Sequence, residues 1–175
     1  VETTGEEGGE TVGWSAGNRE FACFTSAIPV PRELPHVYLH GAIHAIPRLG
    51  INPRAFDKWD CALLAGYVLR YPELSLQAIG AQLTGIEKRS FTNLMQSAKD
   101  EWNRGAESAA FDRTELPDYI QAHLNKKGLM KGTVHDFRVA LYTVPEEATD
   151  YAAKDSLVTS RESEVLFGQL ETEPK

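Results

Sequence analysis

The apolar residues between positions 56 and 68 recur at the spacing of an α-helix, and this pattern constrains the fold most. Residues three and four positions apart lie on one face of a helix, so the pattern predicts a helix over about residues 53–70 with one buried face. Tyr71 and Pro72 then end it. The apolar set consists of Phe56, Trp59, Leu63, Leu64, Tyr67 and Val68.

Two further helices are expected after this one. Ser75 can cap a second helix that runs to about residue 83, because its hydroxyl can accept a hydrogen bond from an amide of the first turn. A turn follows at Thr84 and Gly85, since glycine readily adopts the left-handed conformation that ends helices. The amphipathic pattern over residues 87–103 predicts the third helix.

The segments after residue 103 carry weaker signals. Residues 117–124 are expected to form a shorter helix, whereas residues 135–145 fit either a strand or a helix. Residues 146–158 are weakly helical in pattern, and residues 160–175 have the composition of a polar tail. The predicted fold class is therefore mainly α.

The composition changes at both ends of the chain, which predicts three regions. Residues 1–20 are rich in glycine, threonine and glutamate, and residues 27–35 are rich in proline, which favours extended backbone. We therefore expect an extended N-terminal arm over residues 1–50, a compact helical core over 51–145 and an extended C-terminal arm over 146–175. The chain begins with Val1 rather than methionine, as expected for a processed product or a shortened chain.

The charge distribution separates the core from both arms. The formal net charge is −7, from 25 acidic and 18 basic residues. Residues 1–20 carry five acidic groups and one basic group, and residues 146–175 carry eight and three. The remaining residues are therefore slightly basic, and contact with a phosphate depends on local charge. The acidic ends could equally serve only to keep the protein soluble.

Neither the cysteines nor the histidines predict a bound metal or a disulfide. Cys23 and Cys61 lie far apart in apolar segments, which favours buried free thiols in a reducing compartment. His36, His40 and His44 are spaced four apart and could present three zinc ligands on one helix face. A glycine inside the segment and prolines on both sides disfavour that helix, and no carboxylate or cysteine completes the set.

The sequence lacks the common signatures of catalysis. It contains no GxSxG elbow, no P-loop, no GxGxxG after a predicted strand and no HExxH pair. We therefore expect no enzyme and no cofactor. No apolar run reaches the roughly 20 residues that a membrane helix needs, so we also expect a soluble protein with no membrane partner.

A basic turn offers one candidate contact to a nucleic acid. Lys126, Lys127 and Lys131 surround Gly128 and Gly132. Glycine lets backbone amides approach a phosphate, while the lysines supply positive charge. The alternative is an ordinary solvated turn.

Residues 76–96 offer a second candidate, because their small, turn and core residues fit the spacing of a helix-turn-helix motif. The side chains that could then contact base edges are Lys88, Arg89, Ser90, Thr92 and Asn93. Acidic residues on the same predicted helix weaken this interpretation. A helix-turn-helix transcriptional regulator that binds DNA therefore remains the alternative function, and an interaction domain without nucleic acid is a third.

Three segments, in chain order, resemble the coat proteins of flexible filamentous plant RNA viruses, above all those of the potyvirus kind. They are AFDKWDCALLAGY (residues 55–67), KRSFTNLMQSAKDEWN (88–103) and HDFRVALYTVP (135–145). Arg89 falls at the position of an arginine that this family presents to RNA, and Asp136 matches an aspartate of its last core segment. The family also carries a serine in a longer loop. Here that loop is short, and Ser75 is the candidate.

The resemblance implies a capsid protein that polymerises into a helical filament and encapsidates single-stranded RNA without sequence specificity. Such a protein resides in the virion and the host cytoplasm. The implied RNA-binding residues are Arg89, Asp136 and Ser75, beside which Lys88 and the three lysines of the basic turn are candidates. In this family the arms join subunits, which makes inter-subunit anchors of Trp14, Phe21, Phe24, Val165, Leu166 and Phe167.

Overall fold

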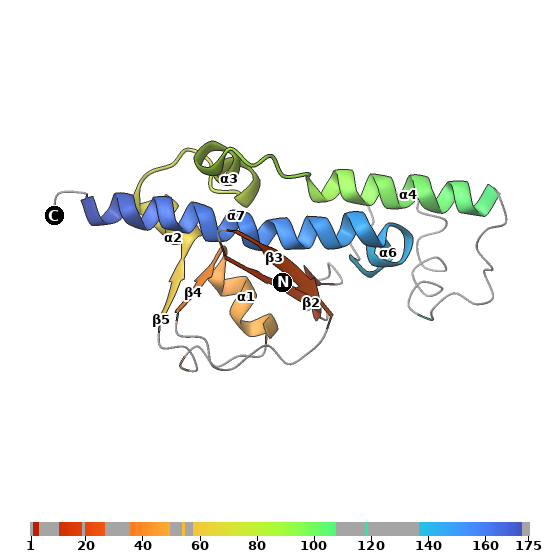
Figure 1. Cartoon of the computed structure of the whole chain (residues 1–175), viewed down its shortest axis with the longest axis horizontal. Helices are drawn as coiled ribbons and strands as arrows, with labels where there is room; N and C mark the ends of the chain where they lie inside the picture. The colour runs from red at the N-terminus through yellow and green to blue at the C-terminus, as the bar shows by residue number, and fades with distance from the viewer. Residues whose placement is uncertain are drawn as a thin grey trace.

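A single long helix organises the fold. The computed structural model describes residues 2–3, 11–18, 20–26, 36–49, 54, 58–107, 118 and 137–172. Helix α7, Pro145–Thr172, contains 28 residues and is therefore about 42 Å long. It runs through the middle of the molecule, and most of the other elements pack against it (Figure 1).

The beginning of α7 follows from its sequence. Pro145 occupies the first helical turn, where a missing amide donor costs nothing. Glu146 and Glu147 follow in the same turn, and their charges complement the positive end of the helix dipole. The expectation of an extended C-terminal arm is therefore wrong for residues 146–172, which form the central helix.

The N-terminal region forms strands that pack on this helix. Strands β1 (Glu2–Thr3), β2 (Thr11–Gly17) and β3 (Ala22–Thr25) make an antiparallel sheet in that order. The Ser156 hydroxyl of α7 donates a hydrogen bond to the Ser15 hydroxyl of β2 at 2.7 Å. The described parts of residues 1–25 thus fold onto the core of their own chain, which corrects the prediction of an extended arm.

A second small sheet corrects the first predicted helix. Strand β4 (His36–Leu39) pairs in parallel with β5 (Lys58–Cys61), and helix α1 (Ala42–Leu49) lies between them in sequence. Residues 58–61 are therefore a strand, and helix α2 covers only Ala62–Val68. Pairing with β4 satisfies backbone groups that the expected helix would have satisfied internally.

The apolar face predicted for the first helix is largely exposed rather than buried. Leu64, Tyr67 and Val68 are 55%, 71% and 64% exposed, and Trp59 of β5 is 38% exposed. The buried side of α2 instead consists of Ala62, Ala65 and Gly66. Ala62 and Ala65 pack in one cluster with Ile79 of α3 and Leu166 of α7.

The next helix agrees with its prediction. Helix α3 spans Leu76–Thr84, and the Ser75 hydroxyl accepts a hydrogen bond from the Ala78 amide at 3.2 Å. Gly85 ends the helix with a φ of 69°, a conformation that costs glycine little. Helix α4 spans Phe91–Glu107, beginning four residues later than expected.

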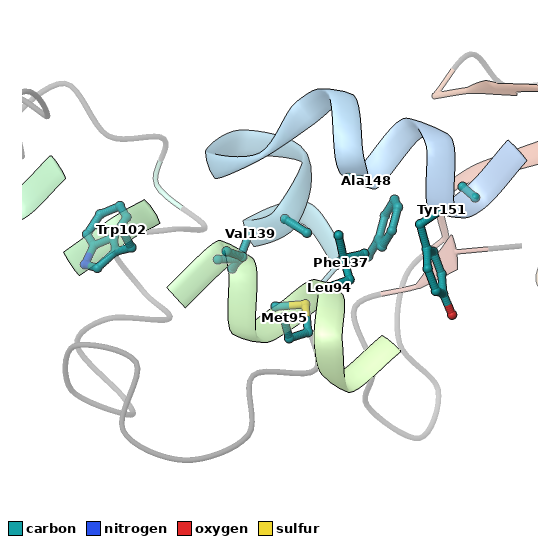
Figure 2. Packing of buried hydrophobic residues seen from close by; sticks show 10 residues of the cluster. Leu94, Met95, Trp102, Phe137, Val139, Ala148 and Tyr151 are labelled. Atoms are coloured by element: carbon teal, nitrogen blue, oxygen red, sulfur yellow. The ribbon is translucent and has the colours of Figure 1, made fainter. Parts of the chain in front are cut away.

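The main core lies between α4, α7 and helix α6, Phe137–Thr143, so the ambiguous segment before Pro145 is helical (Figure 2). A smaller cluster joins α2, α3 and the second half of α7. The prediction of a mainly helical protein is confirmed. Among the described residues, no helix has the length and hydrophobicity needed to cross a membrane. The main cluster consists of Leu94, Met95, Ala98, Trp102, Phe137, Val139, Ala140, Ala148, Tyr151 and Ala152.

Candidate nucleic-acid interface

The segment between α3 and α4 holds the two basic residues singled out in the sequence. Residues 85–90 are non-helical, and α3 and α4 lie over different stretches of α7 (Figure 1). Helix α3 packs on α7, whereas α4 packs mainly on α6. A helix-turn-helix motif joins its two helices through a turn of three or four residues. The longer connection here places Lys88 and Arg89 before α4 rather than on it.

Lys88 is held by α7. Its Nζ atom lies 2.5 Å from Asp155 Oδ1, donates to the Tyr151 hydroxyl at 3.2 Å and sits 4.3 Å from the centre of the Tyr151 ring. Only 8% of the lysine side chain is exposed. Burial raises the pKa of the Asp155 carboxyl, although the charge of Lys88 partly offsets this effect. The ammonium group therefore has a structural role here, and this geometry corrects its prediction as an RNA contact.

Arg89 is placed differently from its neighbour. Its guanidinium pairs with the Glu147 carboxylate in the first turn of α7, and the two side chains are 42% and 45% exposed. Ion pairs this exposed contribute between about 0 and 1 kcal/mol, because solvent screens them. The arginine can therefore exchange this carboxylate for another anion at little cost.

A surface hollow of about 440 Å³ lies beside this segment. Ser75 borders it, and its exposed hydroxyl can still donate a hydrogen bond while it caps α3. The polar residues of the lining belong to the start of α3 and to the segment before Arg89. Two acidic residues among them reduce the attraction for a phosphate. The lining consists of Glu73, Ser75, Gln77, Ala78, Ala81, Glu87 and Lys88.

The remaining predicted RNA contacts lie outside the described residues. These are Asp136 and the basic-turn residues Lys126, Lys127 and Lys131. The expected proximity of Asp136 to Arg89 therefore stays a prediction. Of the RNA-binding set, the structure brings Ser75 and Lys88 to one hollow, with Arg89 next to Lys88 in the chain.

Three predicted inter-subunit anchors pack within their own chain. The Phe24 ring meets the Phe137 ring edge-to-face, with centroids 5.7 Å apart. Leu166 is fully buried, and the Phe167 ring lies 5.8 Å from that of Tyr38. Leu166 therefore cannot contact a neighbouring subunit in this conformation, which corrects its assignment as an anchor.

The other predicted anchors retain some exposure. Phe21 is 65% exposed in the β2–β3 hairpin, and Val165 is 37% exposed on α7. Trp14 is half-buried on β2. Phe21 and Val165 thus remain the best available anchors of the predicted set.

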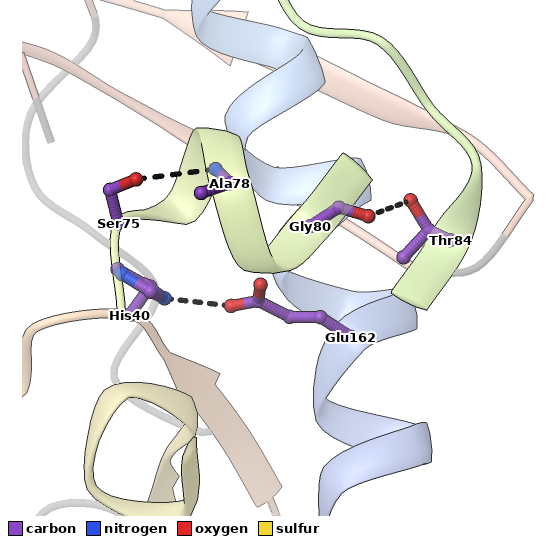
Figure 3. A network of polar contacts seen from close by, with 6 residues as sticks. All are labelled: His40, Ser75, Ala78, Gly80, Thr84 and Glu162. Carbon is purple, nitrogen blue, oxygen red and sulfur yellow. Dashed lines mark hydrogen bonds and ion pairs between the residues drawn. The ribbon is translucent and has the colours of Figure 1, made fainter. Parts of the chain in front are cut away.

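A buried His40–Glu162 pair was missed by sequence reasoning. The Glu162 side chain is fully buried, and its Oε1 atom lies 2.7 Å from His40 Nδ1 (Figure 3). Its Oε2 atom has no hydrogen-bond partner among the described residues and lies close to Gly80 of α3. Burial raises the pKa of the Glu162 carboxyl, and the contact with His40 only partly opposes this rise. No local signal could have joined two residues 122 positions apart.

Among the described residues, neither the other histidine nor the two cysteines form a metal site. His36 Nε2 lies 2.8 Å from Asp60 Oδ2, and the described residues contain no cluster of three or more potential metal ligands. The side chain of His44 lies outside the described residues. Both cysteines are free thiols, as predicted, but Cys23 is exposed and only Cys61 is buried.

Replacing Glu162 with glutamine should change how stability depends on pH. The folded-state pKa of Glu162 exceeds its ordinary value of 4.5, so the folded protein binds this proton more tightly than the unfolded chain. The resulting stabilisation is present below pH 4.5 and is lost as the pH rises through the folded-state pKa. Glutamine cannot ionise. The free energy of unfolding of Glu162→Gln should therefore rise relative to wild type in urea titrations as the pH is raised above 4.5.

The exposed Glu164 on the same helix provides the control for this experiment. Glu164→Gln removes the same charge from α7 without a buried partner. If both variants follow the same pH profile relative to wild type, burial of Glu162 does not cause the effect.

Comparisons with known proteins add no family to these observations. No protein-family model matches the sequence, and comparisons with curated proteins and with solved structures found no significant similarity. The chemistry of the site and the resemblance of the three segments therefore carry the functional inference.

Proposed function

We propose that this chain is a coat protein that polymerises into a flexible helical filament and packages single-stranded RNA without sequence specificity. The proposal depends chiefly on one observation. Arg89 lies in a non-helical segment directly after Lys88, which borders the same hollow as Ser75. Among the described residues, the ion-pair partner of Arg89 is an exposed carboxylate. The protein would then reside in the virion and in the host cytoplasm.

The chemistry of Arg89 suits a phosphate better than a base edge. A guanidinium presents a planar set of donors that matches both carboxylate and phosphate oxygens. In this structure Arg89 pairs with one such anion, the carboxylate of Glu147. Arg89 also precedes α4, whose first residue is Phe91, and so does not project from a helix that could enter a DNA groove. Contact with the RNA backbone carries no sequence information, which is what packaging requires.

The local electrostatics favour weak binding by each subunit. Glu73 and Glu87 share the hollow with Ser75, and Glu147 accompanies Arg89. A single site of this kind holds RNA poorly. Many subunits along one strand act together, so that weak contacts sum to a stable complex.

Exposed apolar groups could supply the contacts between subunits. Leu64, Tyr67 and Val68 form an exposed apolar face on α2, and Phe21 and Ile43 are 65% and 80% exposed elsewhere. Contacts between different surfaces of identical subunits produce open helical assemblies when the rotation does not close. The distribution of these groups over separate elements is compatible with such an assembly.

Replacing Arg89 with alanine should weaken RNA binding about tenfold, as expected for loss of a hydrogen-bonded contact to a charged group. The slope of log K against log salt concentration should fall by about 0.7, the value for one phosphate contact on a single strand. Fluorescence anisotropy with a labelled oligouridine of about 20 nucleotides, long enough to span a typical single-strand site, measures both quantities. Electron microscopy with nuclease protection then tests whether filaments containing RNA still form.

Arg104 supplies a matched control. It is exposed on α4 and pairs with Glu101 at i, i+3, so Arg104→Ala removes the same charge and a similar surface ion pair. Equal losses of RNA binding in the two variants would contradict a specific role for Arg89. A purified protein that neither binds oligouridine nor forms filaments would overturn the proposed function itself.

A further inference from the structure

We infer that Glu147 competes with RNA phosphate for Arg89. This competition lowers the affinity of the site for anions, so that only a polyanion binds strongly enough to displace the carboxylate. This inference rests on the proposed function, because it describes how the same site is regulated. In the absence of RNA the carboxylate occupies the guanidinium, and binding of the strand exchanges one anion for another.

The two ion pairs of this segment differ in solvent exposure, and only an exposed pair can exchange its anion for a phosphate. The Lys88 side chain is 8% exposed and contacts both Asp155 and Tyr151, so an incoming phosphate cannot reach its ammonium group without disrupting the core. Arg89 and Glu147 are each almost half exposed, and a phosphate can approach their contact from solvent. Arg89 is therefore the exchangeable cation of the pair, and Lys88 fixes the backbone from which it projects.

The position of Glu147 makes its release inexpensive. The residue lies in the first turn of α7, where the unsatisfied amides and the helix dipole stabilise a negative charge. After a phosphate takes its place on Arg89, the carboxylate remains next to this favourable helix end and in contact with water. A carboxylate in the middle of a helix lacks this interaction with the helix dipole and would lose more stabilisation on leaving the arginine.

The same position gives Glu147 a second effect on the bound strand. Once displaced, its charge lies close to the phosphate that replaced it, and the two anions repel each other. Competition and repulsion both weaken binding. Only an anion with more charge and more acceptors than a carboxylate, arranged along a polymer, overcomes both effects. Glu147 thereby discriminates RNA from single small anions.

The neighbouring Glu146 allows a sharp test. It is exposed in the same first turn of α7, and no ion pair of its side chain appears among the described residues. Glu147→Gln and Glu146→Gln therefore change the net charge and the helix-dipole interaction equally. They differ in the contact with Arg89.

Binding of the same labelled oligouridine should be measured by fluorescence anisotropy for both variants at several salt concentrations. Glu147→Gln should lower the Kd about threefold, within the range that exposed ion pairs contribute, whereas Glu146→Gln should change it much less. Added inorganic phosphate should compete with oligouridine at lower concentrations in Glu147→Gln than in wild type. Circular dichroism verifies that each variant is folded.

A double variant shows whether the effect acts through Arg89. In the Arg89→Ala background, Glu147→Gln should no longer improve binding beyond the effect of Glu146→Gln, because the competed cation is gone. A gain that persists without Arg89, or equal gains in the two glutamine variants, would overturn the inference.

The outcome also separates the inference from the proposed function. If Arg89→Ala weakens binding more than Arg104→Ala while the two glutamine variants behave alike, the RNA site stands and the role of Glu147 fails. If no variant binds oligouridine, both proposals fail together.

Discussion

Replacing Gly80 with alanine is expected to destabilise the protein by about 3 kcal/mol, near the upper end of what overpacking a core usually costs. Gly80 is buried in α3 where this helix crosses α7. A Cβ atom added there would lie 2.2 Å from Val158 Cγ1, far inside the contact distance of two carbons. Val158 is itself fully buried, so relief requires the two helices to separate.

Gly168 provides the matched control for this prediction. It is exposed on α7, and a Cβ atom added there would meet nothing within 4 Å. Because alanine favours helix more than glycine does, Gly168→Ala should stabilise the protein by up to about 1 kcal/mol. Urea denaturation of both variants measures these free energies. Similar stabilities would show that α3 and α7 do not pack as closely as described.

The consequence of Gly80→Ala extends to the candidate site. The hollow next to Lys88 is bordered in part by Ser75, Gln77, Ala78 and Ala81 of α3 and its cap. If α3 moves away from α7, this border moves with it. Weaker RNA binding by a folded Gly80→Ala variant is therefore expected even though residue 80 does not border the hollow.

Helix α3 shows what the sequence could predict. Its limits depend on Ser75, which caps the first turn, and on Gly85, which adopts a positive φ at the end. Both effects act within a few residues, so the sequence contains all the information needed. The exposed position of Arg89, just before α4, is likewise compatible with its prediction as a contact residue.

Residues 146–172 show why other predictions failed. Their sequence contains many charged groups, but Asp155 and Glu162 are directed inward and pair with Lys88 and His40. The partners lie 67 and 122 positions away, so a local pattern of polar residues resembles a solvated tail. The prediction of a helix over residues 58–61 is wrong for a similar reason. These residues form β5 because they pair with His36–Leu39, which lie more than 20 positions earlier in the chain.

Lys88 illustrates the same difficulty at the level of single side chains. In sequence it is as basic as Arg89, and nothing local distinguishes the two. In the structure, the Lys88 side chain contacts Asp155 and Tyr151. The Arg89 side chain instead pairs with the exposed Glu147 at the start of α7. Because the sequence predicts a helix from residue 87, it does not indicate that Lys88 faces the core and Arg89 the solvent.

Replacing Phe137 with alanine is expected to destabilise the protein by about 4 kcal/mol, the usual cost of removing a buried phenylalanine. The ring is fully buried and lies 5.7 Å from the Phe24 ring and 6.3 Å from the Tyr151 ring, between centroids. It thus joins β3, α6 and α7 in one cluster. Figure 2 shows Phe137 and Tyr151 within this cluster. For a chain of this length the melting temperature should fall by roughly 10 °C.

Two further substitutions define how this result is interpreted. Phe137→Leu keeps most of the buried volume and should cost less than about 1.5 kcal/mol, whereas Val165→Ala removes a partly exposed side chain and should cost about 0.5 kcal/mol or less. Calorimetry should therefore show the largest loss of stability for Phe137→Ala, a smaller loss for Phe137→Leu and the smallest for Val165→Ala. If Val165→Ala proves as damaging as Phe137→Ala, the main cluster is not where the stability of this fold resides.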